Sequence, residues 1–202
     1  MRTALRATPM ALLAAVTLCG CSAERTVTRE YLDPQTAVTV RAVAVPFVYA
    51  HDVPALAANV RDYLSAGAVE LNNMGGRTHY LAVIAWSTVD RKRIGAEAPP
   101  LGTLRLAVGT KVREIAPATR DPRSVGVGLP LFRPATGYLS EGWYALTVAE
   151  LRALAEKPPT TLELVDEQGS ISYTLWRDAT PALADFVRDI PDTITPSNRR
   201  TR

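Results

Sequence analysis

The sequence is poor in the residues that most often bind metals or form disulfides. Cysteine occurs twice, as Cys19 and Cys21 in the stretch TLCGCS, and histidine occurs twice, as His51 and His79. Thiolate metal sites and disulfide frameworks need further partners at defined spacing, and no third cysteine is present. We therefore expect no metal site, no cofactor and no disulfide in the folded domain.

Long apolar runs are also missing. The longest near the start, Met10 to Leu18, has about nine residues, under half of the roughly 20 that a transmembrane helix needs. It follows Arg2 and Arg6 and precedes Gly20, which is the three-part order of a secretory signal. The sequence therefore predicts a cleaved signal peptide over residues 1–20 rather than a permanent transmembrane helix.

The end of this segment, Leu18-Cys19-Gly20-Cys21, resembles the lipobox of bacterial lipoprotein precursors, in which an aliphatic, a variable and a small residue precede an invariant cysteine. The resemblance implies cleavage between Gly20 and Cys21, a diacylglyceryl thioether on Cys21 and an acylated, palmitate-bearing N-terminus. Cys19 would leave with the signal. Ser22 rather than aspartate follows the cysteine, which in such lipoproteins favours the outer membrane. An ordinary cleaved signal is the alternative.

Net charge gives no support for nucleic-acid binding. Removing residues 1–20 takes away two arginines and no acidic residue, which lowers the formal charge from +3 to +1. Two short basic clusters remain, at 91–93 and 199–200, and we expect them to be solvated surface or contacts to anionic lipid. We therefore expect membrane attachment through the acyl chains on Cys21, another envelope protein as a further partner, and no nucleic acid.

The remaining chain suits one domain. About 180 residues follow the signal, enough to bury a core without disulfides. Residues 21–30 are predicted to be the lipidated N-terminus and a tether, because this stretch is short, polar and charged. Residues 31–190 are predicted to form a single β-rich domain. Residues 191–202, from Pro191 onward, are predicted to be a disordered tail.

Alternating or valine-rich segments predict six to eight strands. They are separated by turn signals at 72–76, 109–110 and 166–169, and no strand–helix–strand order or repeat is present. Pro46 allows only an edge or a bend in the first of them. The predicted strands cover 36–49, 62–71, 77–90, 103–108, 111–115, 142–146, 161–165 and 170–176.

Helical signals are fewer. A short helical turn is expected after Pro54, a capping box at Thr147–Glu150 predicts a helix that ends before Pro158, and Thr180-Pro181 predicts the start of a last amphipathic helix. The fold class that follows is mainly β, a β-rich α+β domain. We expect an antiparallel sandwich or curled sheet with two or three short helices at its edge.

No catalytic residue can be assigned. Neither His51 nor His79 has the partner spacing of a zinc helix or a nucleophile elbow to serve. The glycines at 126–128 lack the third glycine of a phosphate-binding loop. Asp166-Glu167 sit on a turn and would bind calcium weakly at most.

Two features favour ligand binding. Residues 116–137 form a long stretch rich in proline and glycine without a stable period, which is typical of a functional or mobile loop. Trp176 falls on the polar face of its strand, where we expect it to be either exposed or covered by the last helix, and we take it as a candidate ligand contact. The chain is thus predicted to be a non-catalytic envelope lipoprotein, with a hydrolase acting on cell-wall or lipid material as the alternative.

Overall fold

The computed structural model describes residues 28–56, 59–91, 93–95, 101–132, 137–167 and 169–191 of the 202-residue chain. The predicted signal peptide with Gly20 and Cys21, most of the predicted tether and nearly all of the predicted tail lie outside these residues. Among the residues described, no helix has the length and apolar character needed to cross a membrane.

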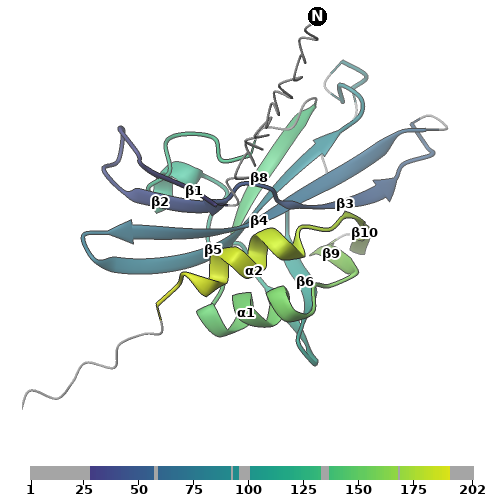
Figure 1. Cartoon of the computed structure of the whole chain (residues 1–202). Coiled ribbons are helices and arrows are strands. Elements are labelled where there is room, and N and C mark those ends of the chain that lie inside the picture. The colour runs from purple at the N-terminus through teal and green to yellow at the C-terminus, as the bar shows by residue number, and fades with distance from the viewer. Residues whose placement is uncertain are drawn as a thin grey trace, which may run out of the picture.

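Ten antiparallel strands form one curled sheet within the described part of the chain, a half-barrel with two short α-helices across one of its faces (Figure 1). The predicted fold class is confirmed, and the curled sheet is the one of the two predicted forms that is observed. The strands are β1 (Thr28–Leu32), β2 (Thr39–Val43), β3 (Phe47–Asp52), β4 (Arg61–Asn73), β5 (Gly76–Ser87), β6 (Thr103–Val108), β7 (Lys111–Ile115), β8 (Tyr138–Ala145), β9 (Thr161–Asp166) and β10 (Gly169–Arg177).

The long strands β4 and β5 form the centre of the sheet. They pair along their whole length, from Asp62 opposite Ser87 to Asn73 opposite Gly76. The two residues between them are the tip of the predicted turn, and both have positive φ, 50° at Met74 and 92° at Gly75. On its other side β5 pairs with β8, so five consecutive residues of β5, 81–85, are buried, as expected for a strand covered from two sides.

The other edge of β4 is shared by two strands. β3 pairs with its first half, from Arg61 to Ala66, and β2 pairs with its second half, from Val69 to Asn72. The single strand predicted over 36–49 is therefore wrong in detail, because the chain leaves the ladder around Pro46, which has no N–H to donate. From β3 the sheet continues through β10, β9 and β6 to β7, and from β2 it ends at β1.

The last residues of the predicted tether are part of the sheet. β1 begins at Thr28 and pairs with β2, so residues 28–30 belong to a strand. The helical turn expected after Pro54 falls partly on residues 57–58, which lie outside the described residues, and up to Leu56 the chain forms a hydrogen-bonded turn in which Leu56 N–H donates to Val53 O. A polar sequence alone does not show that an edge strand will pair, because backbone groups make that pairing.

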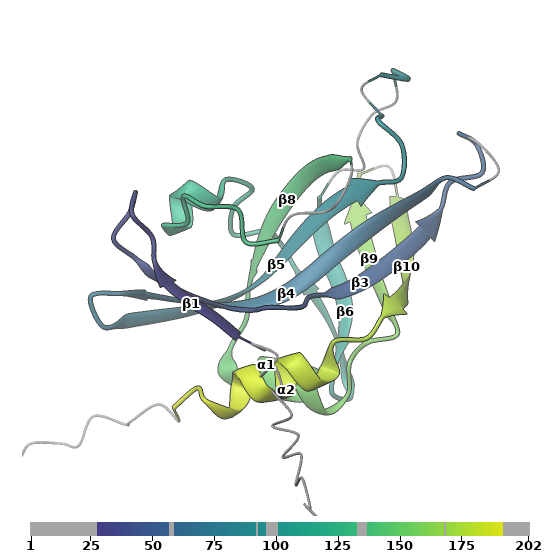
Figure 2. The ribbon, with the colours of Figure 1, turned by 45° about the horizontal axis from the view of Figure 1, so that its top comes forward.

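The two α-helices cover one face of the curled sheet (Figure 2). α1 (Val148–Glu156) starts at the predicted capping box, where Thr147 Oγ1 accepts from Glu150 N–H and the Glu150 carboxylate accepts from Thr147 N–H. α2 (Thr180–Arg188) packs on α1 and on β2. The helices bury Leu154 and Leu183 against alternate residues of β4, which include Ala66 and Ala68. The main core lies in this layer.

The long loop predicted over 116–137 is described for residues 116–132 and 137, and this part covers the opposite face of the sheet. It contains a short 3₁₀-helix, η1 (Pro122–Val125), and hydrogen bonds to β8, with Ala118 N–H donating to Trp143 O at 2.7 Å. Val127 and Phe132 of the loop are buried. The ring of Phe132 leaves no room for a side chain at Gly67, where a Cβ would lie 2.3 Å from Phe132 Cζ. The described part of the loop is therefore a second, smaller packing layer.

A buried carboxylate joins this loop to the β1–β2 turn. Asp33 accepts from the backbone N–H groups of Gln35 and Thr36 in its own turn and from those of Gly128 and Leu129 in the loop, at 2.7 to 3.3 Å. Burial alone would raise the pKa of Asp33, but these four donors outweigh it, and the pKa lies below its ordinary value. Asp33 is therefore an ionised anchor for the loop.

Candidate functional site

A groove of about 400 Å³ lies on the loop-covered face of the sheet, between the end of the described loop and Trp176. We call it the Trp176 groove. Its floor comes from β3, β4 and β5, one wall from the loop and the other from β10. The lining residues are Arg29, Ala44, Pro46, Val48, Tyr63, Ser65, Trp86, Leu131, Phe132, Trp176 and Arg177.

Strand phase places Trp176 on the groove face, and a bulge in β10 adds Arg177 to the same face. Leu175 pairs with Tyr49 and Arg177 pairs with Val48, so an extra residue is inserted into β10 between these pairs. A bulge of this kind changes the direction of side chains beside it, and here both Trp176 and Arg177 line the groove. Trp176 is 58% exposed, so of the two outcomes expected for it, exposure is the one observed. Helix α2 lies on the other face.

A stacked pair of aromatic rings forms the floor. Tyr63 and Trp86 are cross-strand partners, and their rings stack with centroids 4.2 Å apart and an angle of 13° between their planes. The indole N–H of Trp86 donates to Ser65 Oγ at 3.0 Å. Trp176 meets Tyr63 edge-on at 6.4 Å. The aromatic surface is therefore fixed by the sheet rather than by a loop.

An arginine holds the indole of Trp176 in place. The guanidinium of Arg61 lies 4.7 Å from the centre of the Trp176 ring, a cation–π contact, and donates to Asp52 at 2.6 Å. The hydrogen bond to Asp52 raises the pKa of Arg61. The charge of Arg61 is thus paired with a carboxylate, and one face of Trp176 is occupied.

The charge on the groove itself is positive. Arg29 and Arg177 are exposed, and within the described residues neither has a carboxylate partner in an ion pair. No aspartate or glutamate is among the lining residues. The site therefore combines an apolar and aromatic floor with two arginine side chains at its rim.

His51 lies outside the Trp176 groove. Its Nδ1 donates to the backbone oxygen of Ser172 at 3.0 Å, and its ring packs 5.4 Å from that of Tyr173. Burial raises the pKa of Tyr173, which keeps its hydroxyl neutral. His51 and Trp176 line a neighbouring depression from opposite ends of the same β3–β10 region. The contacts of His51 are those of a residue held on the sheet surface.

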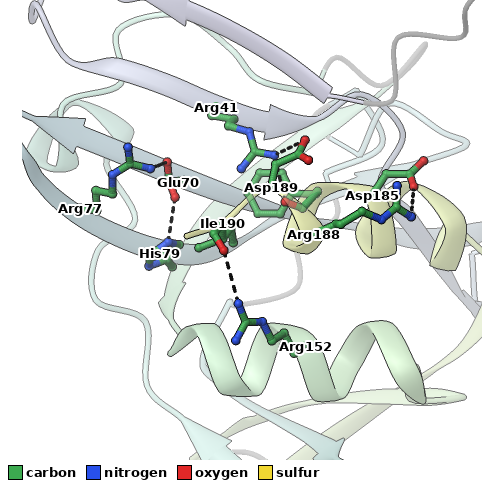
Figure 3. Close-up of polar contacts among 10 residues, drawn as sticks. Arg41, Glu70, Arg77, His79, Arg152, Asp185, Arg188, Asp189 and Ile190 are labelled. Carbon is green, nitrogen blue, oxygen red and sulfur yellow. Dashed lines mark hydrogen bonds and ion pairs between the residues drawn. The ribbon is translucent and has the colours of Figure 1, made fainter. Parts of the chain in front are cut away.

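His79 belongs to a polar cluster that the sequence analysis missed. Glu70 is only 4% exposed, and its two carboxylate oxygens accept from His79 Nε2 at 3.0 Å and from Arg77 at 2.8 Å (Figure 3). The signal that could have shown this was the turn at 74–75, because its register places Glu70 directly opposite His79. By strand alternation Glu70 lies on the same face as Ala66, which is the helix-covered face.

The cluster lies beside a second ion pair at the end of α2. Arg41 donates to Asp189 at 3.1 Å and to the backbone oxygen of Phe186 at 2.9 Å. The two ion-paired groups meet at a depression of about 430 Å³, whose lining includes Arg41, Asp189, Glu70 and Arg77. In the described part of the chain His79 has no hydroxyl or thiol partner that could act as a nucleophile. The Glu70–His79 pair therefore orients an imidazole without the remaining parts of a catalytic triad.

The other candidate residues have local roles. The glycines at 126 and 128 lie where the loop packs on Val38 and hydrogen-bonds to Asp33. Asp166 accepts from Gly169 N–H within its turn. Arg91 of the predicted surface cluster instead forms a buried ion pair with Asp62, so that expectation was wrong for Arg91. Among the described residues no group of three or more histidine, cysteine or acidic side chains could hold a metal ion.

Comparisons with known proteins found no relative. No protein family matches the chain, and neither a curated protein nor a solved structure matches it.

Proposed function

We propose that this chain is a lipid-anchored lipoprotein of the cell envelope, held at the outer membrane and facing the periplasm, whose β domain binds another envelope component without catalysing a reaction. The observation that carries the binding role is the Trp176 groove, an aromatic surface with an exposed indole on a rigid sheet. The anchor rests on the motif Leu18 to Cys21 and its resemblance to a lipobox.

The groove has the composition of a binding site rather than of a hydrolytic one. General acid–base catalysis needs a side chain that can take or give a proton near pH 7, usually histidine or a carboxylate. The described residues that line the Trp176 groove include no such side chain, and the hydroxyl of Ser65 already accepts from Trp86. Aromatic surface with a few charged groups at its rim is typical of ligand recognition.

Metabolic labelling with palmitate tests the anchor. The wild-type chain should carry the label, and Cys21→Ala should carry none, while Cys19→Ala keeps it because Cys19 leaves with the signal. Label on Cys21→Ala, or none on the wild type, would show that the chain is not anchored through Cys21.

Crosslinking in gently solubilised membranes tests the binding role. Trp176→Ala should lose at least one crosslinked species that the wild type forms. Met74→Ala is the matched control, because Met74 is fully exposed at the β4–β5 turn and does not line the groove. Identical species for all three chains would contradict binding through the groove.

An envelope hydrolase is the second candidate, and the buried Glu70–His79 pair is the observation that favours it. Under this alternative, His79→Ala should abolish a phenotype that depends on the gene, whereas His51→Ala should leave that phenotype unchanged. The double substitution of His51 and His79 removes both histidines of the chain. If the phenotype survives that substitution, histidine catalysis is ruled out and the binding role remains.

A further inference from the structure

We infer that the Trp176 groove binds the head group of an anionic phospholipid from the membrane that carries the anchor. This inference rests on the proposed lipid anchor and names the ligand of the proposed binding site. The anionic head group would meet Arg29 and Arg177, and the glycerol and first methylene groups would lie on the apolar floor.

The two arginines at the rim of the groove favour an anionic ligand. Arg29 comes from β1 and Arg177 from the bulge of β10, so two separate elements bring guanidinium groups to one groove. Arginine donors match the geometry of phosphate oxygens and bind them in charge-assisted hydrogen bonds. Among the described residues that line the groove none is acidic, so none of them competes with a ligand for these two side chains.

A neutral glycan fits the groove less well. Sugars need several side-chain donors and acceptors as well as an aromatic face, and the part of the lining that the structure describes contains no carboxylate and no amide side chain. The indole N–H of Trp86 and the hydroxyl of Ser65 are already bonded to each other. Arg61 occupies one face of Trp176. The charged part of the described lining is the pair Arg29 and Arg177.

The rest of the lining suits the part of a phospholipid next to the phosphate. Pro46, Val48, Leu131 and Phe132 are apolar, and Trp176 has an apolar ring with a polar N–H, the kind of side chain that favours a membrane–water boundary. A volume of about 400 Å³ is at the small end of ligand sites, so it holds a head group and a few methylene groups rather than whole acyl chains.

The position of the groove in the chain favours a lipid of the same membrane. Arg29 follows Cys21 by eight residues, which extend to at most about 28 Å. Acyl chains on Cys21 would therefore hold the side of the domain that carries Arg29 close to the bilayer surface. A head group in that surface is then within reach of the groove at high local concentration.

The test uses the acylated full-length protein in lipid vesicles, either of phosphatidylcholine alone or with phosphatidylglycerol added. Co-flotation with both kinds of vesicle reports the anchor, and protection of tryptophan fluorescence from an aqueous quencher reports the groove. We expect flotation in both, but stronger protection only where phosphatidylglycerol is present. In neutral detergent, water-soluble dihexanoyl phosphatidylglycerol should give the same protection and dihexanoyl phosphatidylcholine should not.

The double variant Arg29→Gln and Arg177→Gln should bind dihexanoyl phosphatidylglycerol about tenfold more weakly or worse. Lys111→Gln with Arg123→Gln is the control of equal net charge, since both residues are exposed and lie outside the groove. Far-UV circular dichroism checks that both variants fold.

Each outcome separates the two proposals. Flotation without any effect of phosphatidylglycerol overturns the lipid inference and leaves the anchor in place, whereas failure to float contradicts the anchor. If both double variants bind dihexanoyl phosphatidylglycerol equally weakly, the lipid responds to the net charge of the protein rather than to the two arginines of the groove. Inorganic phosphate that protects at the same concentration as the lipid would show a simple anion site and overturn the assignment to a phospholipid.

Discussion

At the scale of single residues, the lack of a side chain at one strand position lets the loop pack on the sheet. Gly67 in the middle of β4 is the clearest case, because Phe132 lies over it and its ring also forms part of the groove wall. Val43 approaches the same position from β2. The absence of a Cβ at Gly67 is therefore what lets the loop approach the sheet and define one side of the groove.

We expect Gly67→Ala to lower the free energy of unfolding by about 1–3 kcal/mol, since the new methyl group would clash with Phe132 and Val43. Urea denaturation measures the change. In the background of Phe132→Ala, where the ring is removed, the same substitution should cost clearly less, and the difference between the two costs gives the coupling. Equal costs in both backgrounds would show that Phe132 is not the obstacle.

At the scale of elements, local patterns predicted most strands well. The hairpins at 103–115 and 161–177 and the two helices are close to the predicted ranges, because alternation, turn residues and capping residues are all near in sequence. The exposure of Trp176 was expected for the same reason, from its phase in the strand, while its role as a ligand contact stays a prediction. Its neighbours in the groove were not found, since their meeting depends on how β3, β4, β5 and β10 pair.

The missed features are those that depend on register. Glu70 pairs with His79 across the β4–β5 hairpin, and Arg177 turns into the groove only because of the bulge after Leu175. The turn at 74–75 fixes the register that pairs Glu70 with His79, but that register becomes readable only once both turn residues are placed, and the bulge has no such signal in the sequence. The loop over 116–132 was ambiguous for a related reason, because its order comes from packing on the sheet and from Asp33 rather than from its own periodicity.

The turn of the central hairpin gives a prediction at this scale. Met74 and Gly75 both have positive φ, as in a type I′ turn, where Asn-Gly is the preferred pair. Met74→Asn should therefore raise the free energy of unfolding by about 0.5–1 kcal/mol, because asparagine tolerates this conformation better than methionine. Gly75→Ala should have the opposite sign. Thermal unfolding measures both, and a destabilised Met74→Asn would contradict this description of the turn.

At the scale of the whole molecule, the curled sheet separates two layers with different roles. The helices fill one face with an apolar core, while the other face carries the loop and the Trp176 groove. Two of the buried carboxylates, Glu70 and Asp33, differ in the same way. Glu70 pairs with side chains of its own hairpin, whereas Asp33 connects the first turn of the domain with the loop that forms the groove wall.

This connection makes the groove face sensitive to acid. The pKa of Asp33 is lower in the folded chain than its ordinary value, so its contribution to stability is present above about pH 4 and is lost as the pH falls through the folded-state pKa. Asp33→Asn should lower the free energy of unfolding at pH 7 by about 2–3 kcal/mol, because two loop N–H groups and two turn N–H groups lose a charged acceptor.

The variant should also lose part of the decline in stability that the wild type shows below pH 4, since asparagine does not titrate. Chemical denaturation from pH 7 to pH 3 measures both effects, with Glu156→Gln, an exposed carboxyl at the end of α1, as the control. An Asp33→Asn variant whose stability falls with acid as steeply as that of the wild type would assign the acid sensitivity to other carboxyl groups.

The same variant should also weaken the protection of Trp176 by ligand, even at pH 7. Asp33 holds Leu129, and the groove residues Leu131 and Phe132 come shortly after Leu129 in the chain.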